Sequence, residues 1–208
     1  MEWMIQDNNH HHPNCPIDSN KIVHGNCTEL PRMMAETKML EPGSHNLVIY
    51  KDLKTFREIY SQCSRALLPK DEIVVIGTQY DSPDKVKDTL RLVGVDVERH
   101  LNKGTLFIVD AQQGYQGCDP RGIWKLAMSL LSRTKKEGRR GVTWVGDAGS
   151  FFSFEKIEEL MQYELSLPQK YEDTIKTMCS YHLKDFETLT EGQQHTLIHH
   201  HFKSILVE

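Results

Sequence analysis

Histidines near the carboxyl terminus have the spacing closest to that of metal ligands. His195 and His199 are four residues apart on a predicted helix, and His200 and His201 extend the cluster. Two imidazoles at this spacing lie on one helical face and can share a transition metal. The alternative is an exposed helix end, where histidines interact favourably with the helix dipole. We favour the alternative, because no carboxylate or cysteine stands at a matching short spacing.

Cys179 and His45 are two further candidates for polar chemistry. Cys179 lies inside a strand-like run, where most cysteines are small buried hydrophobes and become reactive only beside a cation or a base. His45 precedes the first strand-like run, and a neutral imidazole there could bind a ligand or a metal. A surface histidine with one backbone hydrogen bond is the more common case, so both roles stay open.

The sequence lacks the loop that binds nucleotide phosphates in related βαβ units. Such a loop is rich in glycine and carries a lysine, whereas the turn GTQYDSPDK has only Gly77 and places the negative Asp81 there. Asp110 ends an apolar run as magnesium-binding aspartates do, but without a phosphate loop we favour a capping role. The serine motif G-x-S-x-G is also absent. Nucleotide hydrolysis by the usual route is therefore not expected.

A parallel sheet would bring these candidates together. Apolar strand-like runs alternate with helical patterns, and several runs are apolar on both faces, as in central parallel strands covered by helices. This order predicts a three-layer α/β fold with a mostly parallel sheet, helices on both faces and no Walker A loop. The runs are at 47–50, 72–77, 105–111, 142–148, 174–181 and 204–207.

The first 43 residues have a different character. They are polar, lack sustained periodicity and contain four prolines, Pro13, Pro16, Pro31 and Pro42. We expect residues 1–43 to be a polar, flexible extension and residues 44–208 to form the α/β domain.

Ligands of open α/β sheets bind outside the carboxyl ends of the strands. In this chain that rim would combine aromatic side chains with a few polar groups, the mixture expected of a small-molecule pocket. The alternative is that the aromatic rings pack within a loop layer. The candidate ligand-binding residues are His45, Tyr50, Tyr80, Asp110, Tyr115, Asp147, Phe151, Cys179 and Tyr181.

Composition excludes several classes of partner. With 25 basic and 29 acidic residues the net charge is −4, so no global positive field attracts nucleic acid or an anionic membrane. No apolar run reaches the roughly 20 residues of a membrane span, and the amino terminus does not resemble a signal peptide. Five cysteines at irregular spacings indicate free thiols in a reducing compartment. We expect a cytoplasmic protein.

From about His45 to Val207 the chain resembles the MEDS domain, the methanogen and methylotroph sensory domain of dichloromethane-responsive regulators. The resemblance rests on HNLVIY, GVDVERHLNKGTLFIVDAQQGY, GVTWVGDAGSFF, YELSLP, and MCSYHLKDF followed by a histidine near the final strand. It implies a RecA-like fold without nucleotide hydrolysis and a role in sensing small molecules, with hydrocarbon derivatives as suggested ligands. The implied site residues are His45, Tyr50, Tyr115, Cys179, Tyr181 and one of His199 to His201. The chain departs from the family where a GE-x-x-W-like turn is usual and Gly146–Phe151 stands instead.

We therefore expect a stand-alone sensor that binds a small, partly apolar ligand at the strand rim, rather than an enzyme. Its partners would be that ligand and a separate output protein, either a regulator or a kinase, and a homo-oligomer is compatible with the sequence. No cofactor is required, although the histidines would suit a bound transition metal. One alternative is a metal- or cysteine-dependent enzyme that uses Cys179 with a carboxyl-terminal histidine. Another is an inactive RecA-like subunit that acts through protein contacts.

Overall fold

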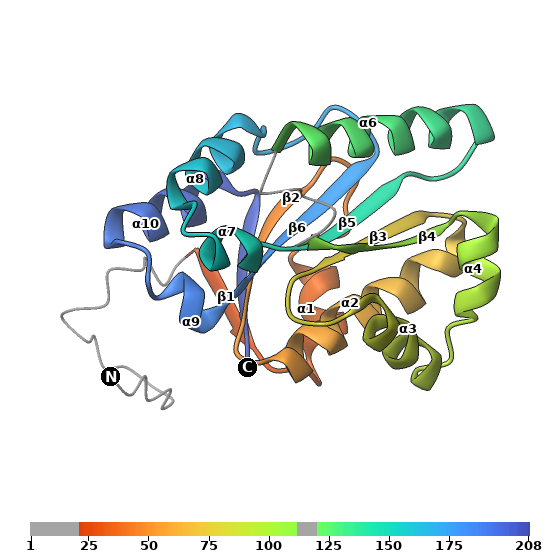
Figure 1. Ribbon diagram of the computed structural model, residues 1–208, viewed down its shortest axis with the longest axis horizontal. Helices are drawn as coiled ribbons and strands as arrows, with labels where there is room; N and C mark the ends of the chain where they lie inside the picture. The colour runs from red at the N-terminus through yellow and green to blue at the C-terminus, as the bar shows by residue number, and fades with distance from the viewer. Residues whose placement is uncertain (1–20, 112–119) are drawn as a thin grey trace.

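A single parallel sheet forms the centre of the molecule (Figure 1). The structure, a computed structural model, describes residues 21–111 and 120–208. Within these residues seven strands follow the order β1-β7-β2-β6-β5-β3-β4, and all neighbouring strands are parallel. The strands are β1 (Ile22–Gly25), β2 (His45–Tyr50), β3 (Ile73–Thr78), β4 (Leu106–Asp110), β5 (Val142–Asp147), β6 (Ile175–His182) and β7 (Lys203–Val207).

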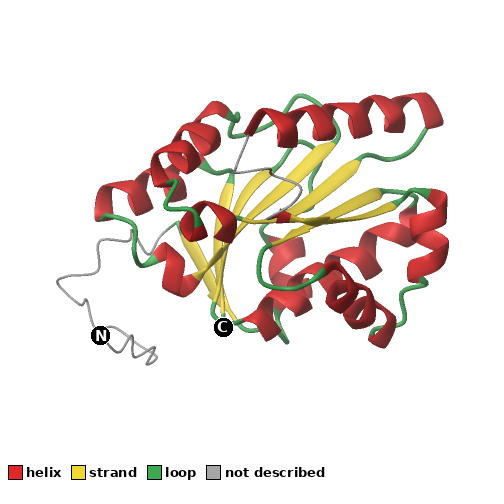
Figure 2. Cartoon of the chain, in the orientation of Figure 1, coloured by secondary structure: helices red, strands yellow, loops and turns green. Residues whose placement is uncertain are grey.

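Helices cover both faces of the sheet and complete three layers (Figure 2). One face carries α1 (Leu30–Glu36), α2 (Leu53–Leu67), the 3₁₀ turn η1 (Leu68–Lys70), α3 (Pro83–Leu92) and α4 (Val97–Lys103). The other carries α6 (Pro120–Glu137), α7 (Gly149–Ser153), α8 (Ile157–Ser166), α9 (Leu183–Phe186) and α10 (Glu191–His200). The fold is therefore the expected three-layer α/β fold, and its sheet order is consistent with a RecA-like architecture.

Local sequence explains where these elements begin and which surfaces they bury. Every residue of β2 and of β3 is buried, as central parallel strands require. Asp52 caps α2 by accepting from the Thr55 amide, and Ser82 followed by Pro83 begins α3. None of the described helices has the length and apolar character that a membrane span requires.

Residues 21–43, expected to belong to a flexible extension, form β1 and α1. β1 pairs in parallel with β7 at the edge of the sheet, and α1 buries Leu30, Met33 and Met34. The pairing joins segments about 180 residues apart, so local sequence patterns could not show it. Residues 1–20 lie outside the described residues.

Candidate functional site

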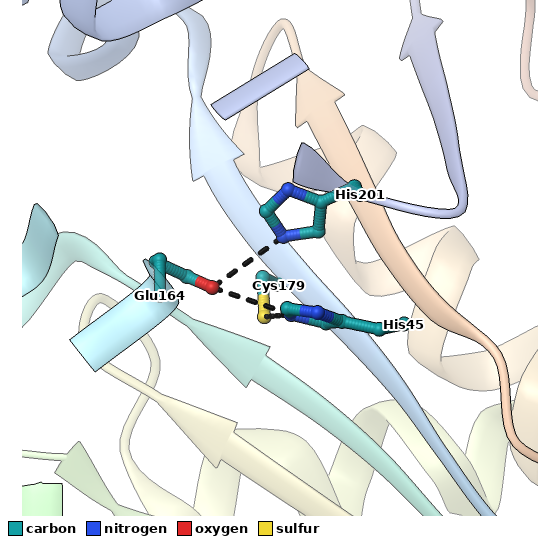
Figure 3. A group of neighbouring side chains, drawn as sticks. All are labelled: His45, Glu164, Cys179 and His201. Carbon is teal, nitrogen blue, oxygen red and sulfur yellow. Dashed lines mark hydrogen bonds and ion pairs between the residues drawn. The ribbon is translucent and has the colours of Figure 1, made fainter. Parts of the chain in front are cut away.

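Four side chains capable of binding metal meet above the sheet: His45, Glu164, Cys179 and His201, here called the quartet (Figure 3). They come from the start of β2, from α8, from β6, and from the residue that follows α10. Their ligand atoms all lie within 4.8 Å of one another. His45, Glu164 and His201 are buried, and Cys179 is partly buried.

Strand and helix periodicity place these side chains together. Successive strand residues alternate between faces, so His45 and Leu47 of β2 share the face on which Cys179 and Tyr181 of β6 lie. On α8, the buried positions are Leu160 and Glu164, one helical turn apart. Glu164 therefore occupies a core position at which a hydrophobic residue would be usual.

Short distances connect the quartet. Oε2 of Glu164 lies 3.3 Å from Nε2 of His45 and 3.4 Å from Nε2 of His201. Sγ of Cys179 is 3.4 Å from the same nitrogen of His45. The other carboxylate oxygen of Glu164 accepts a hydrogen bond of 2.6 Å from the Tyr181 hydroxyl.

Backbone carbonyls determine the tautomers of both imidazoles. Nδ1 of His45 lies 3.1 Å from the carbonyl oxygen of Pro168, and Nδ1 of His201 lies 2.7 Å from that of Leu197. A carbonyl only accepts hydrogen bonds, so each Nδ1 carries the proton, and in a neutral ring Nε2 is left with a lone pair. Both lone pairs face Oε2 of Glu164, which is itself an acceptor.

Burial and proximity shift the pKa values of the quartet. Burial lowers the pKa of His45, and the nearby His201 lowers it further. Burial alone would raise the pKa of Glu164, but hydrogen bonds and positive charge from His201 and His45, which act when a ring is protonated at Nε2, outweigh burial and lower that pKa below its usual range. Burial and the charge of Glu164 raise the pKa of Cys179 well above that of a free thiol. The expected groups are a carboxylate, a neutral His45 and an un-ionised thiol.

A small cavity of about 40 Å³ borders the quartet. Glu164 and Cys179 line it directly, so it has a polar end. Its walls are otherwise mainly apolar, and the aromatic residues among them are Trp124, Trp144, Phe151, Tyr163 and Tyr171. Aromatic walls with a few convergent polar groups are characteristic of small-molecule sites.

The structure separates the sequence-predicted rim residues into groups. His45 and Cys179 belong to the quartet, Tyr181 contacts it, and Phe151 lines the cavity. Asp147 also lines the cavity. Tyr115 lies outside the described residues.

Three of the predicted residues lie away from the quartet. Tyr50 packs with α2 on the opposite face of the sheet, and its hydroxyl reaches Asp147 at 3.2 Å. Tyr80 donates a hydrogen bond of 2.5 Å to Asp185. Asp110 ends β4 near the sheet edge that is remote from β2.

The carboxyl-terminal histidines do not act as one cluster. The rings of His195 and His199 contact each other on α10, with centroids 3.9 Å apart and planes tilted by 32°, as their spacing of four residues predicts. His200 donates from Nε2 to the carbonyl of Leu167 at 2.7 Å. Of these four histidines, His201 alone belongs to a group of at least three potential metal ligands among the described residues.

Glu164 is the member of the quartet that the sequence-based candidates omit, and the cavity residues Trp124, Trp144, Tyr163 and Tyr171 are also absent from them. A glutamate on an amphipathic helix is usually exposed, which explains the omission. Two signals were present: Glu164 lies four residues after Leu160 on the apolar face of the helix, and it belongs to the YELSLP stretch.

Comparisons with known proteins agree with this architecture. The model of the MEDS family, described as the methanogen/methylotroph, DcmR sensory domain, matches residues 44–201, a range that includes the whole quartet. No curated protein matches the chain. A solved structure of an uncharacterized Pyrococcus horikoshii protein, in complex with an unknown peptide, is similar with a TM-score of 0.64. It is 14% identical, and the alignment covers 86% of this chain and 83% of that one, so the likeness shows the fold alone.

Proposed function

The chain belongs to the MEDS family of sensory domains, and on this premise we propose that it senses a small, partly apolar organic molecule bound in the cavity beside the quartet. The observation that carries the proposal is the cavity itself, with aromatic walls and a polar end at Glu164 and Cys179. Burial of apolar surface supplies affinity at such sites, and the few polar groups fix orientation.

The cavity limits the size and chemistry of the ligand. Its volume of about 40 Å³ accommodates roughly three water-sized groups, since one such group needs about 10–15 Å³ by the same measure. The Tyr181 hydroxyl already donates to Glu164, so a ligand hydroxyl or amine could donate only to the remaining acceptors. We propose a small hydrocarbon derivative with one polar substituent.

Binding would change the positions of the helices that form the cavity. Trp124 of α6 and Glu164 of α8 contact the cavity from two helices, and Trp124 is 37% exposed. Oε2 of Glu164 also lies 3.4 Å from Nε2 of His201, the residue that directly follows α10. A ligand that binds one position of α8 more tightly would increase the population of that conformation, and with it would change the surface formed by α8 and α10. We propose that a separate regulator or kinase reads this surface.

A cysteine-dependent enzyme is less well supported. Cys179 and His45 are close enough for proton transfer, with Sγ and Nε2 3.4 Å apart. However, a nucleophilic cysteine needs a lowered pKa, and here burial and the charge of Glu164 raise it. The sensor proposal therefore has priority.

Thermal unfolding in the presence of small alcohols, aldehydes, ketones and halogenated hydrocarbons tests the proposal. A ligand that binds the native state stabilises it by about 2.7 kcal/mol at one hundred times its dissociation constant. We expect at least one class to raise the melting temperature in a saturable way. If no class does so, small-molecule sensing is contradicted.

A cavity-filling variant provides the specificity control. Ala127 of α6 is buried and lines the cavity, so Ala127→Leu should abolish the ligand-induced shift. Ala66→Leu, on α2 across the sheet, makes the same change away from the cavity and should retain the shift. Equal loss in both variants would indicate general destabilisation instead of a filled site.

A further inference from the structure

The quartet concentrates hydrogen-bond acceptors in a buried space. Each imidazole commits Nδ1–H to a carbonyl, so Nε2 of His45 and of His201 point lone pairs at Oε2 of Glu164. Oε2 of Glu164 and Nε2 of His201 have no hydrogen-bond partner, and both residues are at least 97% buried. Buried polar atoms are rarely left without a partner, so this arrangement calls for a cation that all of the acceptors can bind.

We propose that the quartet binds one divalent transition-metal ion through Nε2 of His45, Nε2 of His201, Sγ of Cys179 and the carboxylate of Glu164. Two imidazoles, one thiolate and one carboxylate suit Zn²⁺ and exclude Mg²⁺ and Ca²⁺, which take oxygen ligands. This inference goes beyond small-molecule sensing and does not depend on it.

Spacing of the ligand atoms agrees with a tetrahedral centre. Zinc bonds of 2.0–2.3 Å place neighbouring ligand atoms about 3.3–3.6 Å apart in a tetrahedron. In the structure, Oε2 of Glu164 lies 3.3 Å and 3.4 Å from Nε2 of His45 and of His201, and Sγ of Cys179 lies 3.4 Å from Nε2 of His45. All remaining separations between ligand atoms are within 4.8 Å, so small side-chain rotations would bring the four atoms to tetrahedral positions around one ion.

The surroundings of the quartet are those of metal ligands. Ligating histidines almost always donate the other ring N–H to a carbonyl, a carboxylate or water, and ligating carboxylates are themselves hydrogen-bonded. Pro168 and Leu197 provide the carbonyls, and Tyr181 donates to the second oxygen of Glu164. These outer contacts hold the two imidazoles and the carboxylate with their free lone pairs directed into the quartet, as metal ligation requires.

A shared proton is the competing explanation. A proton on one imidazole or on Glu164 would form one hydrogen bond within the group, but it would leave another buried acceptor facing its neighbours without a donor. The two explanations differ in a measurable way, since only the metal site binds Co²⁺ or Zn²⁺ stoichiometrically through sulfur.

Cobalt titration of the chelator-treated full chain tests the proposal. We expect one Co²⁺ per chain, the intense visible bands of a tetrahedral ion and a near-ultraviolet charge-transfer band from the thiolate. Zn²⁺ should displace the Co²⁺ and remove both spectra. Cys179→Ser should eliminate the charge-transfer band, whereas His195→Ala, which changes a histidine outside the quartet, should leave the titration unchanged.

Glu164→Gln separates loss of metal from loss of fold. Its side-chain amide keeps the size of glutamate and can donate to the imidazole nitrogens, so the metal-free variant should be folded and at least as stable as the metal-free wild type. It should nevertheless lose stoichiometric Co²⁺ binding.

The proposal is overturned if the folded wild type binds no Co²⁺, or if binding survives in both Cys179→Ser and Glu164→Gln. Ala127→Leu fills the cavity without changing a metal ligand, so it should lose the response to organic molecules and keep the cobalt spectrum. This variant therefore distinguishes failure of the sensor proposal from failure of the metal-site proposal.

Discussion

Asp147 is a buried carboxylate whose ionisation differs between the folded and unfolded chain. Only 1% of it is exposed, and it accepts hydrogen bonds from the Gly149 amide at 2.9 Å and from Tyr50 at 3.2 Å. Burial raises its pKa to about 7, against 3.8 for a free side chain. Between these values the folded chain binds a proton that the unfolded chain does not, so folding stability falls as pH rises from about 4 to about 7.

Asp147→Asn should remove this pH dependence. Asparagine keeps the oxygen that accepts from Gly149 but cannot ionise. Relative to the variant, the wild type should lose about 4 kcal/mol of its free energy of unfolding between pH 4 and pH 8, at about 1.4 kcal/mol per pKa unit. Urea unfolding across this range measures the difference. Asp88→Asn, at an exposed position, should show the same change in the free energy of unfolding with pH as the wild type. If Asp147→Asn also shows that same change, the raised pKa of Asp147 is refuted.

Tyr181 positions Glu164 but is not itself one of the proposed metal ligands. Tyr181→Phe removes the hydroxyl that donates to Oε1 of Glu164 while keeping the buried ring. Loss of such outer contacts typically lowers metal affinity about 10–100-fold, so the Co²⁺ dissociation constant should rise by that factor with the charge-transfer band retained. Tyr60→Phe, on the opposite face of the sheet, should bind Co²⁺ like the wild type. Equal affinities in the two variants would show that Tyr181 only packs.

At the level of elements, a buried ionic network joins three adjacent strands. Lys176 of β6 donates to Glu72, which precedes β3, at 2.5 Å, and Thr143 of β5 donates to the same carboxylate oxygen. Glu72 and Lys176 are 3% and 5% exposed, so neither charge has water as an alternative partner. This network ties together the amino-terminal ends of β3, β5 and β6, and β6 carries Cys179 three residues further along.

Lys176→Met should therefore be strongly destabilising. Removing one partner of a buried ion pair leaves an uncompensated charge and typically costs 3–5 kcal/mol, estimated roughly from other proteins. Adding Glu72→Gln should recover much of that loss. Lys135→Met breaks an exposed pair with Asp173 and should cost less than about 1 kcal/mol. Chemical denaturation measures all of these changes, and similar costs for the two lysine variants would show that the network contributes little.

Sequence patterns could predict elements whose signals are local. Apolar runs and helix caps located β2 to β7 and the start of α3, since alternation and capping involve neighbouring residues. His45 and Cys179 were also identifiable, because they lie in strands. The positions of Glu164 and His201 in the quartet depend on how α8 and α10 pack against the sheet. Because this packing is non-local, sequence patterns could not select Glu164, or His201 from among its neighbouring histidines. β1 has only four residues and pairs with the other end of the chain, so it was missed.

For the whole molecule, the two ends of the described chain meet at one edge of the sheet. β1 covers β7, and Glu208 donates its amide to the carbonyl of Gly25 at 3.0 Å. α1 and the following loop contribute buried side chains to the core on the α2 face, namely Leu30, Met33, Met34 and Met39. The MEDS match begins at residue 44, after these elements, yet the same core also packs against β2 and β7.

A chain that begins at Ser44 should consequently be much less stable than one that begins at Lys21. The shorter chain lacks these four buried side chains and that of Ile22, each worth about 1.5–3 kcal/mol, and this loss is comparable to the roughly 5–15 kcal/mol that stabilises a typical domain. It also exposes the edge of β7, whose unpaired backbone groups favour association. Thermal unfolding and size-exclusion chromatography of the two chains should show a lower melting temperature and aggregation for the shorter one. Equal melting temperatures and monomeric elution would mean that β1 and α1 are dispensable, and that the sheet from β7 to β4 is sufficient to hold the quartet.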